Sequence, residues 1–396
     1  MTGRGHDVVV IGAGPAGAVT ARLLAERGHD VVMLEEHAEV GVPVHCTGLL
    51  GLEAFEEFSL PRSLILQQAS GARFWGGAGQ SVGVQSDRIQ AAVIDRAGLD
   101  ALLAARATEA GVALHRGCRA DAIRVVAHHV LVEARGLPAP VRARVCVLAC
   151  GASYRFHRQL GLGLPDVFLQ SAQLQTPFPE MREIEVRFGR TVAPAGFAWL
   201  VPFKRDGVPH ARIGLMSETQ SGDHFKVFAA SLCARAGTDP AQLPPARQKM
   251  LPLGPVARTY ADRIVAVGDA AGLVKPTTGG GIYYGLLSGT LAAGVLHAGL
   301  SKNRLDARFL RRYESQWRTR LGQEIRIGLA FRRIAQGLTD ASIDALIDLA
   351  RVNGIVPLLQ NTASFNWHRK AALALLADRS FRSIVFKSWG RAPRHV

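Results

Sequence analysis

Three glycines near the start of the chain have the spacing of a dinucleotide-binding turn. Gly12, Gly14 and Gly17 form a GxGxxG pattern directly after an apolar run, residues 8–11, suited to a buried parallel strand. The first glycine permits a tight turn, the second lets a pyrophosphate approach the backbone, and the third lets the next helix lie close to the strand. The N-terminus of that helix offers N–H groups and a partial positive charge to the phosphates.

An acidic residue follows at the place where such a site needs one. Glu35 ends a second apolar run, residues 31–34, and would accept hydrogen bonds from an adenosine ribose. A tight strand–turn–helix without a ligand is the simpler alternative, but it would leave Glu35 unexplained. The order of strand, glycines, helix, strand and acid therefore predicts a dinucleotide site.

A second glycine turn lies far along the chain. An apolar run at 264–267 leads into Gly268 and Asp269, and three glycines at 279–281 precede an apolar helix expected from Ile282 to about residue 300. An acid at a strand end, followed by glycines at a helix N-terminus, predicts a second cradle for phosphate or a flavin ring. Because GxGxxG of the opening type occurs once, we expect no separate nicotinamide-binding domain.

The elements around these turns predict an α/β fold. A helix over 95–111 and strands over 112–115, 123–134 and 145–148 complete a doubly wound parallel sheet with an extra three-stranded layer. Residues 49–58 have helical spacing. We expect a discontinuous cofactor-binding domain, an inserted antiparallel-sheet substrate domain and a basic helical C-terminal region, with the respective bounds 1–151 and 259–300, 152–258, and 301–396.

Two further features are open to a structural or a functional interpretation. Phe197, Trp199 and Val201 share one face of an expected strand, where they would pack in a core or line an apolar substrate pocket. Cys46 lies on a loop after the second strand, and it is either an inert small side chain or part of the site. No second cysteine follows it closely, which argues against a disulfide reductase.

Composition and charge limit the partners. The formal net charge is +15, and from residue 301 onward 18 Lys and Arg stand against 7 Asp and Glu, which suggests an anionic partner. A membrane surface ranks above nucleic acid, because no zinc-finger or RNA-binding motif accompanies the charge; a solvated arginine-rich surface is the alternative. Five unpaired cysteines predict reduced thiols and no metal site. Without an apolar leader or spanning run, we expect a cytoplasmic protein, peripheral on a membrane at most.

Residues 7–330 resemble the FAD-dependent geranylgeranyl reductase family, within the para-hydroxybenzoate hydroxylase-like group of flavoproteins. The most specific match is VGDAAGLVKPTTGGGI, followed by PVHCTG, IDRAGLDALLAARATEAG and the FAWLVP strand, which is similar to the family's aromatic-x-Trp-x-apolar-Pro motif. Two positions depart from the group's pattern. Cys150-Gly151 replaces the usual Asp-Gly pair, and Phe197 replaces a tyrosine, which removes a hydroxyl near the substrate.

The resemblance implies FAD as cofactor and assigns residues to its parts. Ala16 and Glu35 would bind the ADP half, and Asp269 would hold the ribityl-pyrophosphate. The remaining implied contacts are Cys46, Thr47 and Gly48 on the isoalloxazine and ribityl side, Arg96 and Ala120 elsewhere on the cofactor, and Gly281 and Ile282 under the flavin ring.

The resemblance also implies reduction of C=C bonds in a prenyl chain carried by a lipid or pigment. Cys46 would supply a proton, and the ring faces of Phe197 and Trp199 would stabilise developing positive charge. The electrons would come from an external donor, either NAD(P)H or a ferredoxin-type protein. The alternative is a flavin-dependent monooxygenase or halogenase acting on an apolar or aromatic substrate, although no motif places the lysine that a halogenase needs. An electron-transfer flavoprotein of the type with an iron–sulfur domain is excluded by the cysteine pattern.

Overall fold

The structure is a computed structural model that describes residues 5–352, 354–362 and 364–389. Two compact units divide the chain, and each is discontinuous in sequence. The first unit comprises Met1–Val44, Arg96–Val167 and Pro252–Ile325, and the second comprises His45–Asp95, Phe168–Leu251 and Arg326–Val396.

The first unit is built on an eight-stranded, mainly parallel sheet in the order β17-β18-β11-β1-β2-β8, with β10 and β9 added beside β11. The central strand β1 is parallel to both β2 and β11, and its last four residues, 8–11, are apolar and almost fully buried. Burial on both faces is typical of a parallel strand covered by helices. The bounds are β1 His6–Ile11, β2 Val31–Glu35, β8 Ala113–Arg116, β9 Arg119–Val126, β10 His129–Arg135, β11 Val141–Leu148, β17 Tyr260–Ala261 and β18 Ile264–Ala266.

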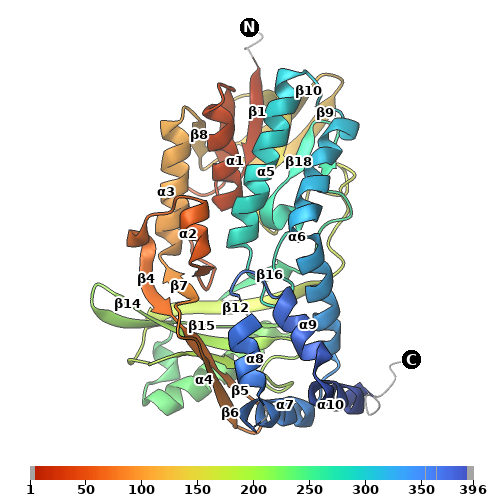
Figure 1. Ribbon diagram of the computed structural model, residues 1–396. Helices are drawn as coiled ribbons and strands as arrows, with labels where there is room; N and C mark the ends of the chain where they lie inside the picture. The colour runs from red at the N-terminus through yellow and green to blue at the C-terminus, as the bar shows by residue number, and fades with distance from the viewer. Residues whose placement is uncertain (1–4, 353, 363, 390–396) are drawn as a thin grey trace. The chain divides into compact units, whose positions relative to one another are not determined.

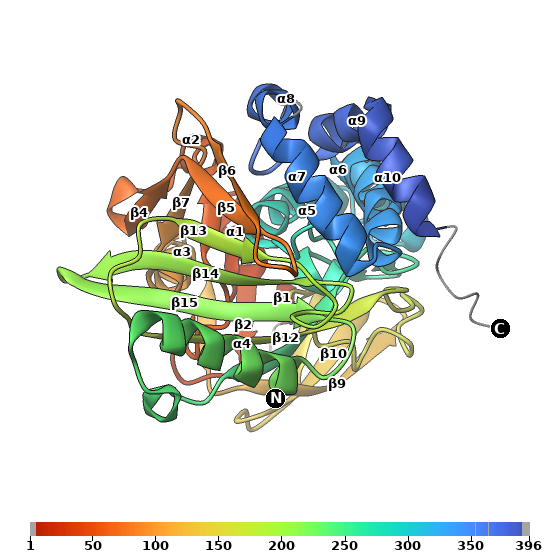
Figure 2. The same ribbon diagram turned by 90° about the horizontal axis from the view of Figure 1, so that it is seen from below.

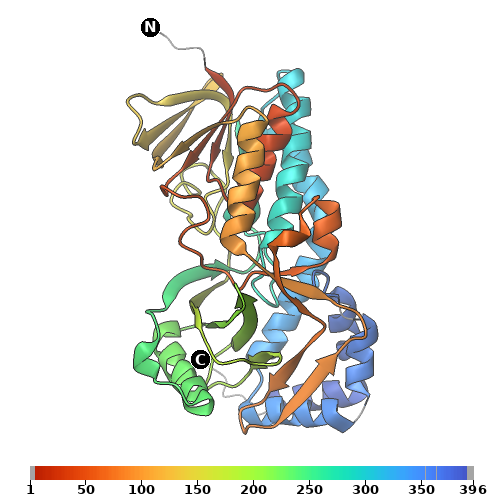
Figure 3. The same ribbon diagram turned by 90° about the vertical axis from the view of Figure 1, so that its left-hand side faces the viewer.

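Three helices lie side by side along this sheet: α1 (Pro15–Ala25), α3 (Arg96–Glu109) and α5 (Ile282–Ser301) (Figures 1 and 3). α6 (Ala307–Gln336) follows, and it carries a stripe of buried residues at every fourth position. These buried residues are Leu305, just before the helix, and Phe309, Tyr313, Trp317 and Leu321.

The second unit contains a seven-stranded sheet in the order β16-β12-β15-β14-β13-β5-β6. Helix α4 (Ser221–Ala236) lies along one face (Figure 2), where Phe225, Phe228 and Leu232 pack on buried strand residues such as Leu200 and Ile213. The opposite face carries Phe197 and Trp199. The bounds are β5 Gly71–Trp75, β6 Ser81–Gln85, β12 Phe168–Pro177, β13 Ile184–Arg187, β14 Phe197–Arg205, β15 Val208–Ser217 and β16 Arg247–Pro252.

A small antiparallel sheet, β3-β7-β4, completes the strands of this unit. Residues 49–58 were expected to form one helix, and that prediction is wrong at its start. Leu49–Gly51 form β3, because Leu49 and Leu50 pair with Val93 and Ala92, and only Glu53–Glu57 form the helix α2. The other bounds are β4 Ile65–Ala69 and β7 Ala91–Ile94.

Four helices follow α6 in the part of the chain that the structure describes. α7 (Asp340–Val352) ends just before Gly354, and α8 (Ile355–Thr362) begins just after it. Two more helices follow α8 among the described residues: α9 (Arg369–Ala377) and α10 (Arg379–Trp389).

The combination of a parallel sheet, antiparallel sheets and C-terminal helices confirms the predicted fold class. The division into units differs from the expected boundaries. Residues 45–95 belong to the second unit, because β5 pairs with β13 there, and residues 152–167 belong to the first. Sequence proximity to the glycine turn does not decide which sheet a segment joins, since strand partners are chosen by long-range pairing.

Candidate functional site

The three glycines of the first turn have different structural roles. Gly12 has φ +106°, and a Cβ there would collide with the carbonyl group of Ala149; a Cβ at Gly17 would collide with the Gly12 carbonyl oxygen. Gly14 has an ordinary extended conformation, and a Cβ at this position would meet no heavy atom within 4 Å. Gly12 and Gly17 are therefore required by the fold, whereas Gly14 faces open space at the N-terminus of α1, as a phosphate-binding glycine should.

Glu35 closes this turn from the end of β2. One carboxylate oxygen accepts a hydrogen bond from the Ala13 N–H (2.9 Å), and the other accepts from the His37 N–H (3.0 Å) and lies 2.6 Å from His37 Nδ1. A carboxylate has about four acceptor positions. The predicted hydrogen bond to a ribose therefore has room beside the three contacts that the protein itself makes.

Small residues bring the two glycine turns together within the first unit. A Cβ at Gly268 would lie 2.9 Å from the Ala16 Cβ, and one at Gly289 would lie 2.5 Å from the Ala16 carbonyl oxygen. Thr20 Oγ1 donates to Ala16 O (2.7 Å) and also lies 3.2 Å from Gly289 O. The start of α1, which carries Ala16, is thus positioned by close contact with α5 and with the turn after β18.

A carboxylate of the protein itself, that of Asp269, lies at the second glycine turn. Asp269 lies in a short 3₁₀ turn after β18, and a Cβ at Gly281 would collide with Asp269 Oδ1. Gly281 is the N-cap of α5 and Ile282 is its first residue, so the carboxylate lies at the positive end of the helix dipole.

Two residues outside every sequence motif support this turn. Tyr154 donates from its hydroxyl to Asp269 O (2.5 Å), and His157 Nε2 lies 2.6 Å from Ala270 O. Burial raises the pKa of Tyr154, with Asp269 and Cys150 adding to the shift, and burial lowers the pKa of His157. Both side chains are therefore neutral at physiological pH and act as hydrogen-bond donors.

Arg96 and Ala120, the other cofactor residues predicted in the first unit, each bind another residue of the protein. Arg96 forms an ion pair with Asp100 one turn later in α3, and both side chains are largely buried. The Ala120 carbonyl accepts from Arg155 Nη1 (3.1 Å). Burial raises the pKa of Cys150 to about 12, so the residue that replaces the expected aspartate carries no charge.

In the second unit, three rows of residues cross the sheet on the face opposite α4. Strand register places Ser171, Met216 and Phe197 in one row, and Gln173, Gly214 and Trp199 in the next. The third row contains Gln175, Arg212 and Val201. The β12 side of this face is therefore polar, and the β14 side is aromatic and apolar.

The segment that carries Cys46 is bound to the polar side. His45 Nε2 lies 3.0 Å from Ser171 Oγ, and Thr47 Oγ1 donates to Gln173 Oε1 (3.1 Å). Because Ser171 and Gln173 occupy adjacent rows, residues 45–47 run along β12, beside the rows that end in Phe197 and Trp199. Cys46 Sγ accepts from the Gly48 N–H (3.3 Å) and is half-buried.

Arg212 secures this segment, and sequence reasoning missed it. Its guanidinium donates to Thr47 O (2.6 Å), Ile94 O (3.0 Å) and Gln175 Oε1 (2.9 Å), and the residue is only 1% exposed. Its Nη1 also occupies the space that a Cβ at Gly48 would need. Alternation along a strand was the available signal, because it places Arg212 on the same face as the aromatic pair.

The aromatic side of the face is continuous. Phe197 and Trp199 have ring centroids 5.7 Å apart, and Phe188 lies 6.0 Å from Phe197. The indole of Trp199 covers Gly214, where a Cβ would come within 2.6 Å of the ring. Trp199 Nε1 is buried and has no hydrogen-bond partner among the described residues.

His45 is held in its neutral form. Ser171 Oγ donates to Lys249 O (3.0 Å), so the hydrogen between His45 and Ser171 is on His45 Nε2 and Nδ1 carries a lone pair. Burial, with Lys249 and Arg247 nearby, lowers the pKa of His45 to about 4. Its buried Nδ1 has no partner in the part of the chain that the structure describes.

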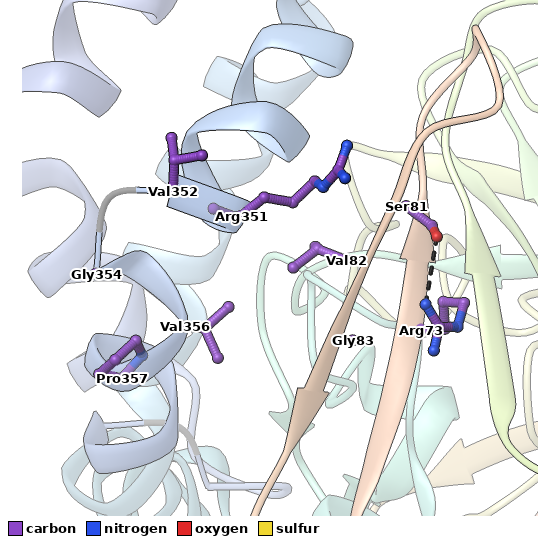
Figure 4. A pocket seen from close by; sticks show the side chains of 10 residues that line it. Arg73, Ser81, Val82, Gly83, Arg351, Val352, Gly354, Val356 and Pro357 are labelled. Carbon is purple, nitrogen blue, oxygen red and sulfur yellow. Dashed lines mark hydrogen bonds between the residues drawn. The ribbon is translucent and has the colours of Figure 1, made fainter.

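A separate open pocket of about 620 Å³ lies between β6 and the helices α7 and α8 (Figure 4). Arg73 on one wall bonds to Ser81 (3.4 Å), and Arg351 and Val352 form part of the other. None of the predicted site residues lines it. Over residues 5–352, 354–362 and 364–389 the structure has no metal-binding cluster and no helix that could cross a membrane. The five cysteines are free thiols.

Comparison with known proteins shows which proteins this chain is similar to. A family model described as Lycopene cyclase protein matches residues 7–345. Digeranylgeranylglycerophospholipid reductase 2 from Methanopyrus kandleri is 31% identical over 372 residues, 89% of this chain and 92% of that protein. The protein of the same name from Methanothermobacter thermautotrophicus is 30% identical and is covered over 91% of its length.

Among solved structures, a geranylgeranyl bacteriochlorophyll reductase-like protein from Thermoplasma acidophilum has a TM-score of 0.83 at 23% identity, covering 97% of this chain and 98% of that one. The fold and the family match define a protein of the lycopene cyclase family. More narrowly, the chain belongs with the digeranylgeranylglycerophospholipid reductases, an FAD-dependent family of prenyl-chain reductases. The family predicted from the sequence motifs is thereby confirmed.

Proposed function

We propose that the chain saturates C=C bonds in the geranylgeranyl chains of a glycerophospholipid, with FAD as cofactor. The observation that carries the proposal is the placement of the Cys46 segment on the sheet face that also presents Phe197 and Trp199. The names of the relatives supply the substrate class. The open position at Gly14, beside Glu35, supports a dinucleotide cofactor in the first unit.

The chain's own residues would meet the demands of an unactivated alkene. FAD, when bound and reduced, supplies the hydride. The Cys46 thiol donates a proton to the other alkene carbon, and the thiolate left behind takes a proton from water. The ring faces of Phe197 and Trp199 stabilise positive charge that develops on carbon. The apolar side of the face excludes water, which would otherwise compete for that charge.

The finding that half of this face is polar refines the expected substrate. A free hydrocarbon offers no hydrogen-bonding group to the polar side of this face, whereas a glycerophospholipid of the kind in the relatives' names brings oxygens that accept hydrogen bonds. We therefore favour a prenylated lipid over an unattached prenyl chain. An external donor, of the NAD(P)H or ferredoxin type, would supply the electrons.

The test is anaerobic reduction of the purified holoprotein, followed by mass spectrometry of detergent-dispersed geranylgeranylated phospholipid. The expected result is a gain of H₂ per double bond. Trp199→Arg should abolish this gain while flavin remains bound, and Val227→Arg, an exposed apolar position on α4, should not. A halogenase in complex with FAD has a TM-score of 0.63 at 17% identity. Halogenation or oxygenation of an aromatic substrate, without H₂ gain on any prenyl lipid, would replace the proposal with that alternative.

A further inference from the structure

Helix α10 has two faces of opposite character. Phe381, Val385 and Ser388 recur at helical spacing and are buried. Phe381 stacks on Phe331 with ring centroids 6.3 Å apart, and Ser388 Oγ accepts from the Thr339 N–H (3.1 Å). The inner face is therefore fixed against the end of α6 and the start of α7.

The outer face of α10 combines cations with one large exposed aromatic. Arg379, Arg382 and Lys387 are exposed, and Phe386 is 71% exposed. At about 3.6 residues per turn, Phe386 lies near the middle of this arc, with Arg382 on one side and Lys387 on the other. Cations alone would keep this surface soluble, so the exposed phenylalanine among them indicates an interaction surface.

The neighbouring helix α9 extends the same surface. Lys370, Leu373 and Ala377 are exposed at spacings of three and four, so they form one stripe, and Leu373 is 48% exposed. α9 and α10 lie side by side within the second unit (Figure 2). One acid, Asp378, stands between them in sequence, and its Oδ1 is engaged by the Phe381 N–H (2.8 Å) as a helix cap.

We propose that the exposed faces of α9 and α10 dock the protein on the surface of an anionic phospholipid membrane. The cations would meet lipid phosphates, and Phe386 and Leu373 would enter the boundary between headgroups and acyl chains. The combination of exposed cations and exposed apolar side chains favours a membrane over a nucleic acid or an acidic protein. Either of those partners would bind through the cations alone and would leave the apolar side chains in water. Such docking would determine where the protein is located, independently of the reaction proposed for it.

The test is co-sedimentation of the holoprotein with vesicles of phosphatidylcholine alone and of phosphatidylcholine mixed with phosphatidylglycerol. Binding should require the anionic lipid and should fall with salt. Each cation near an anionic surface contributes about five-fold in affinity, so the triple variant Arg379→Gln, Arg382→Gln, Lys387→Gln should lose roughly 100-fold. The matched control removes three exposed cations of the first unit: Lys302→Gln, Arg308→Gln, Arg311→Gln.

A second pair of variants tests the apolar part of the surface. Phe386→Ser should weaken binding about ten-fold, whereas Val227→Ser, a 69% exposed position on α4, should not. Equal losses in the two triple variants, or wild-type binding by the α10 triple variant, would overturn the assignment. So would a wild-type protein that ignores anionic vesicles. Turnover of detergent-dispersed substrate is measured in parallel: its retention in the α10 variants separates failed docking from failed chemistry.

Discussion

The glycine turn of the first unit and the Cys46 segment of the second unit are held by different means. The turn is formed by contiguous residues, and what matters there is the absence of side chains at Gly12 and Gly17. The Cys46 segment is held by side-chain hydrogen bonds to residues 126 and 165 positions away in sequence, through Gln173 and Arg212. The conformation of the glycine turn therefore depends on its backbone, whereas the position of the Cys46 segment depends on side chains that are distant in sequence. Mutations should therefore fail in different ways in the two regions.

The largest effect is expected at Gly14. Gly14→Val should abolish bound flavin, and with it all turnover, because the new side chain would fill the space intended for the pyrophosphate. The variant should still fold, since a Cβ at this position meets no protein atom within 4 Å. Flavin absorbance of the purified protein, together with circular dichroism, checks both parts. Gly17→Ala is the contrasting variant, because it should lose fold and flavin together. Stoichiometric FAD in purified Gly14→Val would disprove the proposed pyrophosphate site at Gly14.

Arg212 should give the largest effect on stability in the second unit. Arg212→Met would leave Thr47 O, Ile94 O and Gln175 Oε1 without their donor, at a cost of about 3 kcal/mol or more in unfolding free energy. Urea denaturation of the variant beside Arg88→Met, an exposed arginine in the same unit, measures the difference. Equal midpoints would show that the Cys46 segment does not depend on Arg212.

Cys46 should affect chemistry and leave the fold intact. Proton donation by a positioned group contributes about 10²-fold or more, so Cys46→Ser should lower the rate of alkene reduction by about 100-fold with an unchanged flavin spectrum. Cys118→Ser is the control, since its thiol faces the Arg116 carbonyl in the first unit. Single-turnover kinetics of the reduced protein gives the rate. An unchanged rate in Cys46→Ser would show that Cys46 contributes only to packing.

The smallest effect is a change in acid stability at His45. Its folded pKa, about 4, lies below its ordinary value of 6.5, so the unfolded chain binds the proton first as pH falls. Stability contributed by neutral His45 is thus present above pH 6.5 and is lost as pH falls toward 4, by about 2 kcal/mol between neutral pH and about pH 5.

His45→Gln keeps a donor for Ser171 and removes the titration. Its urea midpoint should therefore fall less than that of the wild type over the same pH range. His157, whose pKa is also lowered by burial, adds to the acid sensitivity of both proteins and cancels in the comparison. Parallel pH profiles for the two proteins would refute the assignment.

The two regions also differ in how far the sequence predicted them. The strand–turn–helix–strand order, Glu35 at the end of β2 and the long helix α5 all depend on local periodicity, and the structure confirms them. The placement of the Asp269 carboxylate at the N-terminus of α5 was not predicted, because it requires the approach of two segments in space. Leu49 and Leu50 were assigned to a helix for the same reason: their strand partner, β7, lies some forty residues later. Arg212 carried no motif at all.

The order in which the chain is synthesised gives the sheet of the first unit a particular consequence. β1 emerges first, yet its neighbour β11 ends at Leu148, β18 follows at Ile264, and α5, which contacts α1, ends at Ser301. Most of the second unit's strands are made in between. Pairing of such distant segments is slow, so a nascent chain must wait for about three quarters of its length before a nucleotide-binding fold can close. Apolar strands left unpaired for that time are prone to aggregation, and the proposed FAD would stabilise the protein only after that point. Flavin supply should therefore raise the yield of folded protein when it is present during refolding of the complete chain, and should have no effect on fragments that end before α5.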